Sequence, residues 1–235
     1  SPLKLEWSKD SKGFYFDEVD MDTPFVAYRR IYHYDLETER KSLITPDVRA
    51  QEPALNPTED KIAFIGTKEN GQRTLSLYFL DQNVAEVLYE APLLERLSRP
   101  LFLSNNKIIF VQRNLKGEDS LMEFDLSEKS VAKMNLDFKD IRFPTVYKNG
   151  ILFVSSKSGI DNIYLTSKDL TSTKSITNTN TWIHSFNWPA SPQKTYPLVF
   201  SQMTASGLKL FETAPRSFAL TEKDPLVQFE DRPKE

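Results

Sequence analysis

Cysteine is absent from this chain of 235 residues, and histidine occurs only twice. Without cysteine there are no disulfide bonds, no thiolate ligands for a metal and no cysteine nucleophile. Long hydrophobic runs are missing as well, because no apolar segment approaches the roughly 20 residues of a membrane-spanning helix. The sequence therefore excludes a disulfide-stabilised scaffold and does not predict a protein that spans a membrane.

Neither sign of charge is in large excess, since 30 Lys and Arg residues stand against 33 Asp and Glu residues. Nucleic-acid binding depends on clustered basic residues, and the richest basic stretch is the short pair Arg29-Arg30. We therefore expect no nucleic-acid partner. No signal peptide opens the chain. We interpret Ser1-Pro2 as a mature or trimmed start, compatible with an export signal that was removed.

The scarcity of histidine limits the chemistry that we expect. A serine hydrolase needs a nucleophile, a base and an orienting acid, and no G-x-S-x-G elbow occurs. His33, between two tyrosines, is interpreted as structural. An acidic segment from Asp17 to Asp22 offers oxygen ligands to calcium, but it lacks the spacing and the glycine of an EF-hand. We expect a solvated acidic loop, no metal, no cofactor and no catalytic site.

What the chain does have is apolar material for a packed core, with 39% hydrophobic and 12% aromatic residues. This material recurs with a period. Five short apolar runs end in a phenylalanine: Phe16, Phe64, Phe110, Phe153 and Phe200. Their spacing matches the roughly 40–50 residues of one propeller blade, and the runs are rich in β-branched and aromatic residues.

Glycine recurs with the same period as the phenylalanines. Four of the seven glycines follow a repeat phenylalanine by six or seven residues: Gly71, Gly117, Gly159 and Gly207. A hairpin turn needs a residue with positive φ, which glycine adopts without steric cost. Each glycine therefore predicts a β-hairpin. In the first repeat Thr23 takes this place, after a longer polar connection that begins at Asp17.

The remaining elements complete a four-stranded unit. Prolines precede three of the apolar runs, and we expect each to begin a short innermost strand, because proline cannot donate to a ladder: Pro53, Pro100 and Pro144. Such a sheet has two apolar faces, which neighbouring sheets bury when they pack around an axis. The predicted fold class is all-β, a β-propeller of about five four-stranded antiparallel blades.

The predicted propeller covers residues 1–222, and residues 223–235 form a C-terminal tail or a closing strand. The blades are expected at roughly these ranges: 1–48, 49–94, 95–138, 139–180 and 181–222. Two alternatives stay open, a ring closed by its own termini and a fragment of a larger propeller. An unclosed ring would expose aggregation-prone faces or edges.

Several motifs resemble the repeat of the TolB-type propeller family. The first unit carries Trp7-Ser-Lys-Asp-Ser-Lys-Gly-Phe-Tyr-Phe16, Arg30-Ile-Tyr-His-Tyr-Asp-Leu36 and Ser42-Leu-Ile-Thr45. The fourth unit is similar through Asn162-Ile-Tyr164 and Ser175-Ile-Thr177. The Pro-Asp-Gly turn of the family is degenerate here, which indicates a divergent member. The family includes periplasmic scaffold proteins and non-catalytic domains of larger peptidases.

The resemblance implies a non-enzymatic module that binds a protein or peptide, in the periplasm or elsewhere in a bacterial cell envelope. Any association with a membrane would pass through such a partner. Two alternatives stay open. One is a regulatory propeller domain of a larger enzyme such as a peptidase. The other is a glycan-binding or glycoside-hydrolase propeller, for which Glu6, Glu52 and Asp140 are the candidate carboxylates.

Four side chains near the predicted channel end are candidate ligand-binding residues: Trp188, Trp182, His184 and Tyr147. Aromatic rings at such a place can stack on a sugar or clamp a peptide. Trp188 heads an enlarged loop of the fifth unit and is the first to probe. The sequence leaves the identity of the partner and the oligomeric state open.

Overall fold

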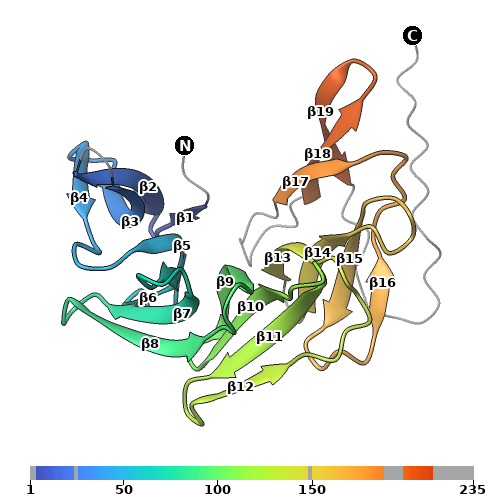
Figure 1. Ribbon diagram of the computed structural model, residues 1–235. Helices are drawn as coiled ribbons and strands as arrows, with labels where there is room; N and C mark the ends of the chain where they lie inside the picture. The colour runs from blue at the N-terminus through green and yellow to red at the C-terminus, as the bar shows by residue number, and fades with distance from the viewer. Residues whose placement is uncertain (1–3, 24–25, 148–149, 188–197, 214–235) are drawn as a thin grey trace. The chain divides into compact units, whose positions relative to one another are not determined.

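The computed structural model describes four stretches of the chain: residues 4–23, 26–147, 150–187 and 198–213. All regular structure in these stretches is β-strand, as predicted, and it forms five antiparallel sheets (Figure 1). No described segment is a helix long and apolar enough to cross a membrane. The chain divides into two compact units, residues 1–134 and residues 135–235.

Unit 1 contains three four-stranded sheets, and in each sheet every strand pairs with the next along the chain. The first sheet consists of β1 (Leu5–Trp7), β2 (Gly13–Thr23), β3 (Val26–Asp35) and β4 (Arg40–Leu43). The second consists of β5 (Ala50–Leu55), β6 (Lys61–Thr67), β7 (Arg73–Phe79) and β8 (Val84–Glu90). The third consists of β9 (Arg96–Ser104), β10 (Lys107–Arg113), β11 (Asp119–Asp125) and β12 (Ser130–Lys133).

Unit 2 contains the remaining two sheets. The fourth sheet consists of β13 (Arg142–Tyr147), β14 (Gly150–Ser155), β15 (Asn162–Ser167) and β16 (Thr173–Ser175). The fifth has three strands in the described residues: β17 (Ile183–Asn187), β18 (Leu198–Thr204) and β19 (Gly207–Thr213). The end of the predicted fifth blade, residues 214–222, and the tail 223–235 lie outside the described residues.

The repeat phenylalanines occupy equivalent places, because each lies on the second strand of its sheet. Phe64, Phe110 and Phe153 are each the fourth residue of β6, β10 and β14, and their side chains are almost completely buried. Phe200 is buried on β18, whereas Phe16 on β2 is half-buried. The period of the sequence thus marks one phenylalanine on the second strand of each sheet, buried in four sheets and half-buried in the first.

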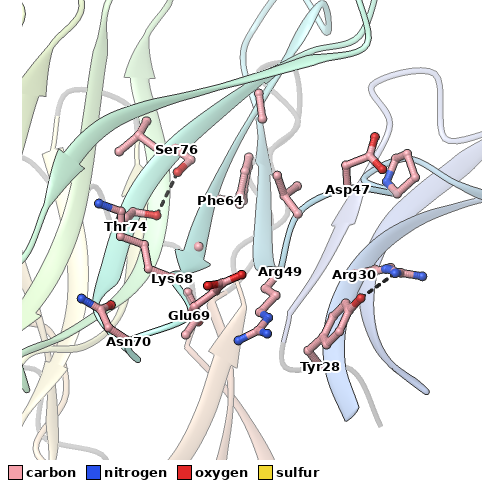
Figure 2. A pocket seen from close by; sticks show the side chains of 16 residues that line it. Tyr28, Arg30, Asp47, Arg49, Phe64, Lys68, Glu69, Asn70, Thr74 and Ser76 are labelled. Carbon is pink, nitrogen blue, oxygen red and sulfur yellow. Dashed lines mark hydrogen bonds between the residues drawn. The ribbon is translucent and has the colours of Figure 1, made fainter. Parts of the chain in front are cut away.

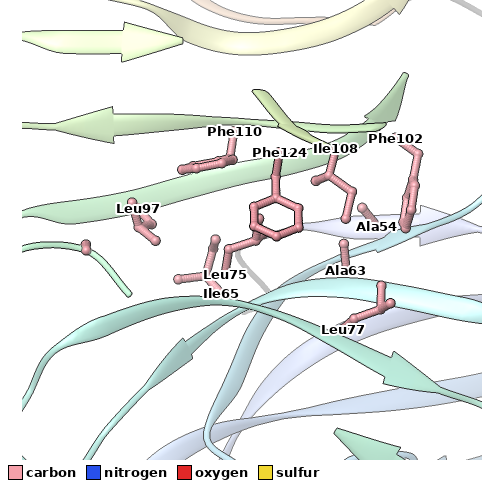
Figure 3. Packing of buried hydrophobic residues seen from close by; sticks show 11 residues of the cluster. Ala54, Ala63, Ile65, Leu75, Leu77, Leu97, Phe102, Ile108, Phe110 and Phe124 are labelled. Atoms are coloured by element: carbon pink, nitrogen blue, oxygen red, sulfur yellow. The ribbon is translucent and has the colours of Figure 1, made fainter. Parts of the chain in front are cut away.

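Neighbouring sheets share their cores within each unit. Figure 3 shows Ile65 of the second sheet in one cluster with Phe110 and Phe124 of the third. A second cluster in unit 1 joins Ile31 of the first sheet to Phe64 of the second. In unit 2 the fourth and fifth sheets share a cluster of their own. A sheet with two apolar faces needs such a neighbour on each side to remove both faces from water.

The predicted glycine turns are confirmed. Gly71, Gly117, Gly159 and Gly207 all have positive φ, between 80° and 99°. At Gly117 the amide donates to the carbonyl of Asn114 at 3.0 Å, which closes the β10–β11 turn. No heavy atom lies within 4 Å of a Cβ built on Gly117, so backbone conformation rather than space requires glycine there.

The prolines were expected to begin the innermost strands, and this expectation is wrong. Pro53, Pro100 and Pro144 lie inside β5, β9 and β13, each beside a shift of register in the pairing with the next strand. The residue before each proline has positive φ, at 56°, 54° and 53° for Glu52, Arg99 and Phe143. A β-bulge leaves a residue unpaired, so the missing proline N–H costs no ladder bond there.

The acidic segment was expected to be a solvated loop, and this expectation is also wrong. It belongs to β2, which pairs with β3 as far as Thr23. Asp17 is completely buried and accepts a hydrogen bond from Arg29 at 2.8 Å. Asp20 accepts from Arg30 at 2.9 Å. The basic residues lie on the partner strand, and opposite charges across a hairpin stabilise the pairing.

Candidate binding site

A cavity of about 1030 Å³ opens between the first and second sheets of unit 1 (Figure 2). Its walls come from β3, from the connection before β5, and from β6, β7 and β8. Ligand sites usually have volumes of roughly 300–1,000 Å³, so this cavity is at the upper end. A smaller cavity of about 410 Å³ adjoins it, and the two share Tyr28, Arg49 and Thr67.

One position of the repeat that lines the cavity is small in the second sheet. Opposite each repeat phenylalanine, the third strand carries a large side chain in the other four sheets: Tyr32, Met122, Tyr164 and Phe211. In the second sheet Phe64 faces Ser76 instead. Gly66 and Thr74, which pair with each other, also line the cavity, so this part of the second sheet presents small residues to it.

Two buried hydroxyl groups form part of the cavity lining. The Oγ1 of Thr74 and the Oγ of Ser76 are 3.0 Å apart, and both residues are only 3% exposed. A Cβ atom at Gly66 would collide with Thr74 Oγ1, so glycine is required there by space. Each hydroxyl can donate one hydrogen bond and accept two. The pair therefore retains hydrogen-bonding capacity beyond its mutual bond.

Tyr28 organises the opposite wall. Its ring is approached by two guanidinium groups, with the Cζ of Arg30 at 4.9 Å and the Cζ of Arg49 at 5.1 Å from the ring centre. Arg30 also donates to the Tyr28 hydroxyl at 2.7 Å and to Asp20. A cation over an aromatic face is stabilised by about 0.5–2 kcal/mol, depending on its desolvation.

Tyr32 acts on this wall through Asp20. Its hydroxyl donates to Asp20 at 2.8 Å, and Asp20 is the partner of Arg30. Burial, together with this hydrogen bond and the charge of Asp20, raises the pKa of Tyr32 to about 12. The same hydrogen bond is the largest cause of the lowered pKa of Asp20. Tyr32 therefore remains a neutral donor and Asp20 remains an anion, which keeps Arg30 paired.

Charged groups also line the cavity at Asp47, Arg49, Lys68 and Glu69. Lys68 forms an ion pair with Glu90. Among the described residues the side chain of Arg49 has neither an ion pair nor a hydrogen bond, only the ring of Tyr28. Figure 2 shows it between Tyr28 and Glu69. The site thus offers hydroxyl groups, an aromatic ring, one unneutralised cation and carboxylates.

The candidate residues from the sequence belong to unit 2 and are not among the residues that line this cavity. Trp182 directly precedes β17 and His184 lies on it, with their rings 5.3 Å apart, and Trp182 is 46% exposed. Tyr147 ends β13 and is buried in the core of the fourth and fifth sheets. Trp188 lies outside the described residues. A ligand-binding role for these four residues stays a prediction.

The three carboxylates considered for glycoside hydrolysis have structural partners. Glu6 pairs with Lys4 at 3.3 Å, and the buried Glu52 accepts from the backbone N–H of Arg99. Burial acts to raise the pKa of Asp140, but hydrogen bonds from Ser155 and Ser156 outweigh it, and the pKa is lowered. A glycosidase acid needs a raised pKa, so Asp140 does not fit that role.

No catalytic constellation is found in the described part of the chain. The ring of His33 lies against that of Tyr15 with centres 4.6 Å apart and a tilt of 42°, and neither His33 nor His184 hydrogen-bonds a serine or a carboxylate there. The described residues also contain no cluster of three or more His, Asp or Glu that would hold a metal ion.

Solved structures with significant similarity to this chain establish the fold. TolB from Acinetobacter baumannii matches 90% of this chain with a TM-score of 0.67 at 16% identity. A putative TolB from Agrobacterium tumefaciens matches 88% of it, with a TM-score of 0.64 at 13% identity. This chain has the fold of the TolB-type β-propellers. Its five sheets are the blades.

The same fold also occurs outside TolB. The β-propeller domain of the Trilobed protease from Pyrococcus furiosus matches 95% of this chain and 85% of its own length, with a TM-score of 0.57 at 16% identity. This chain spans about half, 52%, of TolB from Acinetobacter baumannii. No family model and no curated protein matches the sequence. The likeness therefore establishes the TolB-type fold and leaves the function to be argued from the site.

Proposed function

We propose that this TolB-type propeller is a non-enzymatic module that binds a peptide segment of a partner protein in the cavity between its first and second sheets. The observation that carries the proposal is the small Ser76 opposite Phe64, where the other sheets have a large side chain. The second sheet therefore lacks the large side chain that the other four sheets have at this position. A cavity in a core costs stability, which is understandable at a binding site.

The lining suits a peptide. A peptide presents backbone donors and acceptors together with apolar and charged side chains, and the cavity offers a counterpart to each. The Thr74 and Ser76 hydroxyls can bond backbone groups, and Ala85 and Val87 provide apolar surface. Sites of this kind combine apolar walls with a few polar groups that fix orientation.

The test uses a random peptide library selected against the wild-type propeller, followed by affinity measurement of the enriched peptides by fluorescence anisotropy. Val87 lines the cavity on β8, whereas Val84 on the same strand does not, and both are about half exposed. We expect Val87→Trp to weaken binding at least about tenfold, or about 1.4 kcal/mol. Val84→Trp is the matched control and should bind like the wild type.

A second variant blocks the cavity from inside. Ser76→Met gives the second sheet the residue that the third has at this place, Met122, and should reduce binding while the protein stays folded. Failure to enrich any peptide, or equal effects of Val87→Trp and Val84→Trp, would count against the proposal. We further propose an extracytoplasmic location in a bacterium, which the TolB-type fold supports and which cell fractionation of the native source tests.

A further inference from the structure

Arg49 differs from the other basic side chains that line the two cavities. Each of the others has an acceptor on the protein: Arg29 with Asp17, Arg30 with Asp20, Lys68 with Glu90 and Arg73 with Thr67. Arg49 lines both cavities, and in the described residues its guanidinium has no such acceptor. A half-buried charge without a counter-ion is unfavourable, and an incoming anion removes that cost.

The position of Arg49 is fixed by the fold. Its backbone carbonyl accepts a hydrogen bond from the Thr67 amide at 3.2 Å, which ties this point of the chain to the end of β6. The next residue, Ala50, is buried at the start of β5. The ring of Tyr28, 5.1 Å from the guanidinium carbon, limits where the side chain lies. Binding then costs little further ordering of this side chain.

A guanidinium held over a ring is suited to one kind of ligand. It is planar and carries its N–H donors in a fork that matches the two oxygens of a carboxylate. Contact with a ring through one face leaves the edge of the fork available. Asp47 and Glu69 line the same cavity and repel a ligand with several negative charges. The combination favours a single carboxylate over a phosphate.

Resting on the proposed function, we infer that Arg49 binds a carboxylate of the peptide ligand, supplied by an acidic side chain or by a free C-terminus. The ligand takes the place of the missing counter-ion, and Tyr28 holds the guanidinium for it. Arg49 is then the residue that selects acidic peptides or peptide ends for this cavity.

The experiment follows the arginine Nε–Hε signals of the wild-type chain by NMR during titration with small probes. N-acetyl-glutamic acid amide carries only a side-chain carboxylate, N-acetyl-glutamine carries only an α-carboxylate, and N-acetyl-glutamine amide carries neither. We expect a saturable shift with one or both of the acids and none with the neutral probe. Which acid binds identifies the source of the carboxylate. Inorganic phosphate should bind more weakly than the better acid.

The variant Arg49→Gln should abolish the shift and weaken the peptides enriched on the wild type by about tenfold or more, the size of a charge-assisted hydrogen bond. Arg40→Gln is the matched control, because Arg40 is an exposed arginine on β4 outside both cavities. Equal thermal unfolding of the two variants excludes loss of fold as the cause.

The outcomes separate this inference from the proposed function. Peptides that depend on Val87 but bind Arg49→Gln as well as the wild type would overturn the role of Arg49 and leave the peptide site in place. A carboxylate shift that persists in Arg49→Gln, tighter binding of phosphate, or no shift with either acid would overturn the inference directly. If neither Val87→Trp nor Ser76→Met weakened peptide binding, the proposed function itself would be wrong.

Discussion

The buried carboxylate of Asp17 joins β2 to Lys4, the residue before β1, and to β3. Asp17 on β2 accepts hydrogen bonds from the backbone N–H of Lys4 at 3.1 Å and from Arg29 on β3 at 2.8 Å. The Asp17 side chain is completely buried, whereas Arg29 is 21% exposed. A carboxylate in such a place is stabilised only by its partners, because water cannot replace them.

We therefore predict that Asp17→Ala lowers the free energy of unfolding by about 3 kcal/mol, because Arg29 loses its buried partner. Glu18→Ala is the matched control from the next position, where Glu18 and its partner Lys41 are both more than 40% exposed. We expect that variant to cost less than about 0.5 kcal/mol. Urea unfolding measures both values, and similar losses in the two variants would contradict the interpretation.

At the scale of elements, the innermost strands are shaped by three bulges in which a residue with positive φ precedes proline. Such backbone conformations cost about 1–3 kcal/mol each and persist only where the surroundings fix them. In unit 1 hydrogen bonds join the bulges to residues outside their own sheets. The amide of Arg99 donates to Glu52 of the adjacent sheet, and the carbonyl of Pro100 accepts from Lys4 Nζ at 3.1 Å.

The β5–β6 turn contains a group of hydrogen bonds to the carboxylate of Asp60. Thr58 and Asn56 donate to its carboxylate, and these two hydrogen bonds, with that of Thr58 first, lower the pKa of Asp60 to about 2. Since this pKa lies below the unfolded value of about 3.8, ionised Asp60 stabilises the fold above about pH 4. That contribution is lost as the pH falls toward 2.

We predict that Thr58→Ala raises the pKa of Asp60 toward its ordinary value, because the largest cause of the lowering is removed. Carboxyl NMR titration measures the change. Thr38→Ala is the control, because Thr38 lowers the pKa of Asp35 at a different turn and should leave Asp60 unchanged. A midpoint of Asp60 that stays near 2 in Thr58→Ala would show that Thr58 does not stabilise the ionised form.

Elements with local causes can be predicted from the sequence. Each turn glycine follows from the positive φ that its hairpin requires, and this prediction is confirmed. The period of the phenylalanines correctly predicts their equivalent places on the second strands, and four of the five are buried. The prolines show the limit of such reasoning. A missing N–H fits a strand start and a bulge equally well, and only pairing with the next strand distinguishes them.

The cavity escapes prediction because its walls meet only when two sheets pack. Tyr28, Arg49 and Ser76 come from distant segments, and no local pattern joins them. One signal was available in the repeat, where Ser76 stands at a place occupied by Tyr32 and Met122 in the neighbouring units. Recognising it requires the strand register, which the glycine turns define only approximately.

For the whole molecule, burial is organised between neighbouring sheets. One core cluster consists only of residues from the second and third sheets and their connection, and another only of residues from the fourth and fifth. Architectures in which each module contacts its neighbours lose stability locally before they lose it everywhere. The two clusters therefore serve as separate reporters within one chain.

We predict that Phe110→Ala lowers the free energy of unfolding of its cluster by about 3–5 kcal/mol, because it leaves a cavity in a completely buried site. Hydrogen exchange measured by mass spectrometry should then accelerate over β5–β11 and remain slow over β14 and β15. Phe200→Ala is the matched control in the other cluster and should give the reverse pattern. Uniform acceleration in both variants would mean that the sheets open together, and the neighbour-by-neighbour account of this propeller would fail.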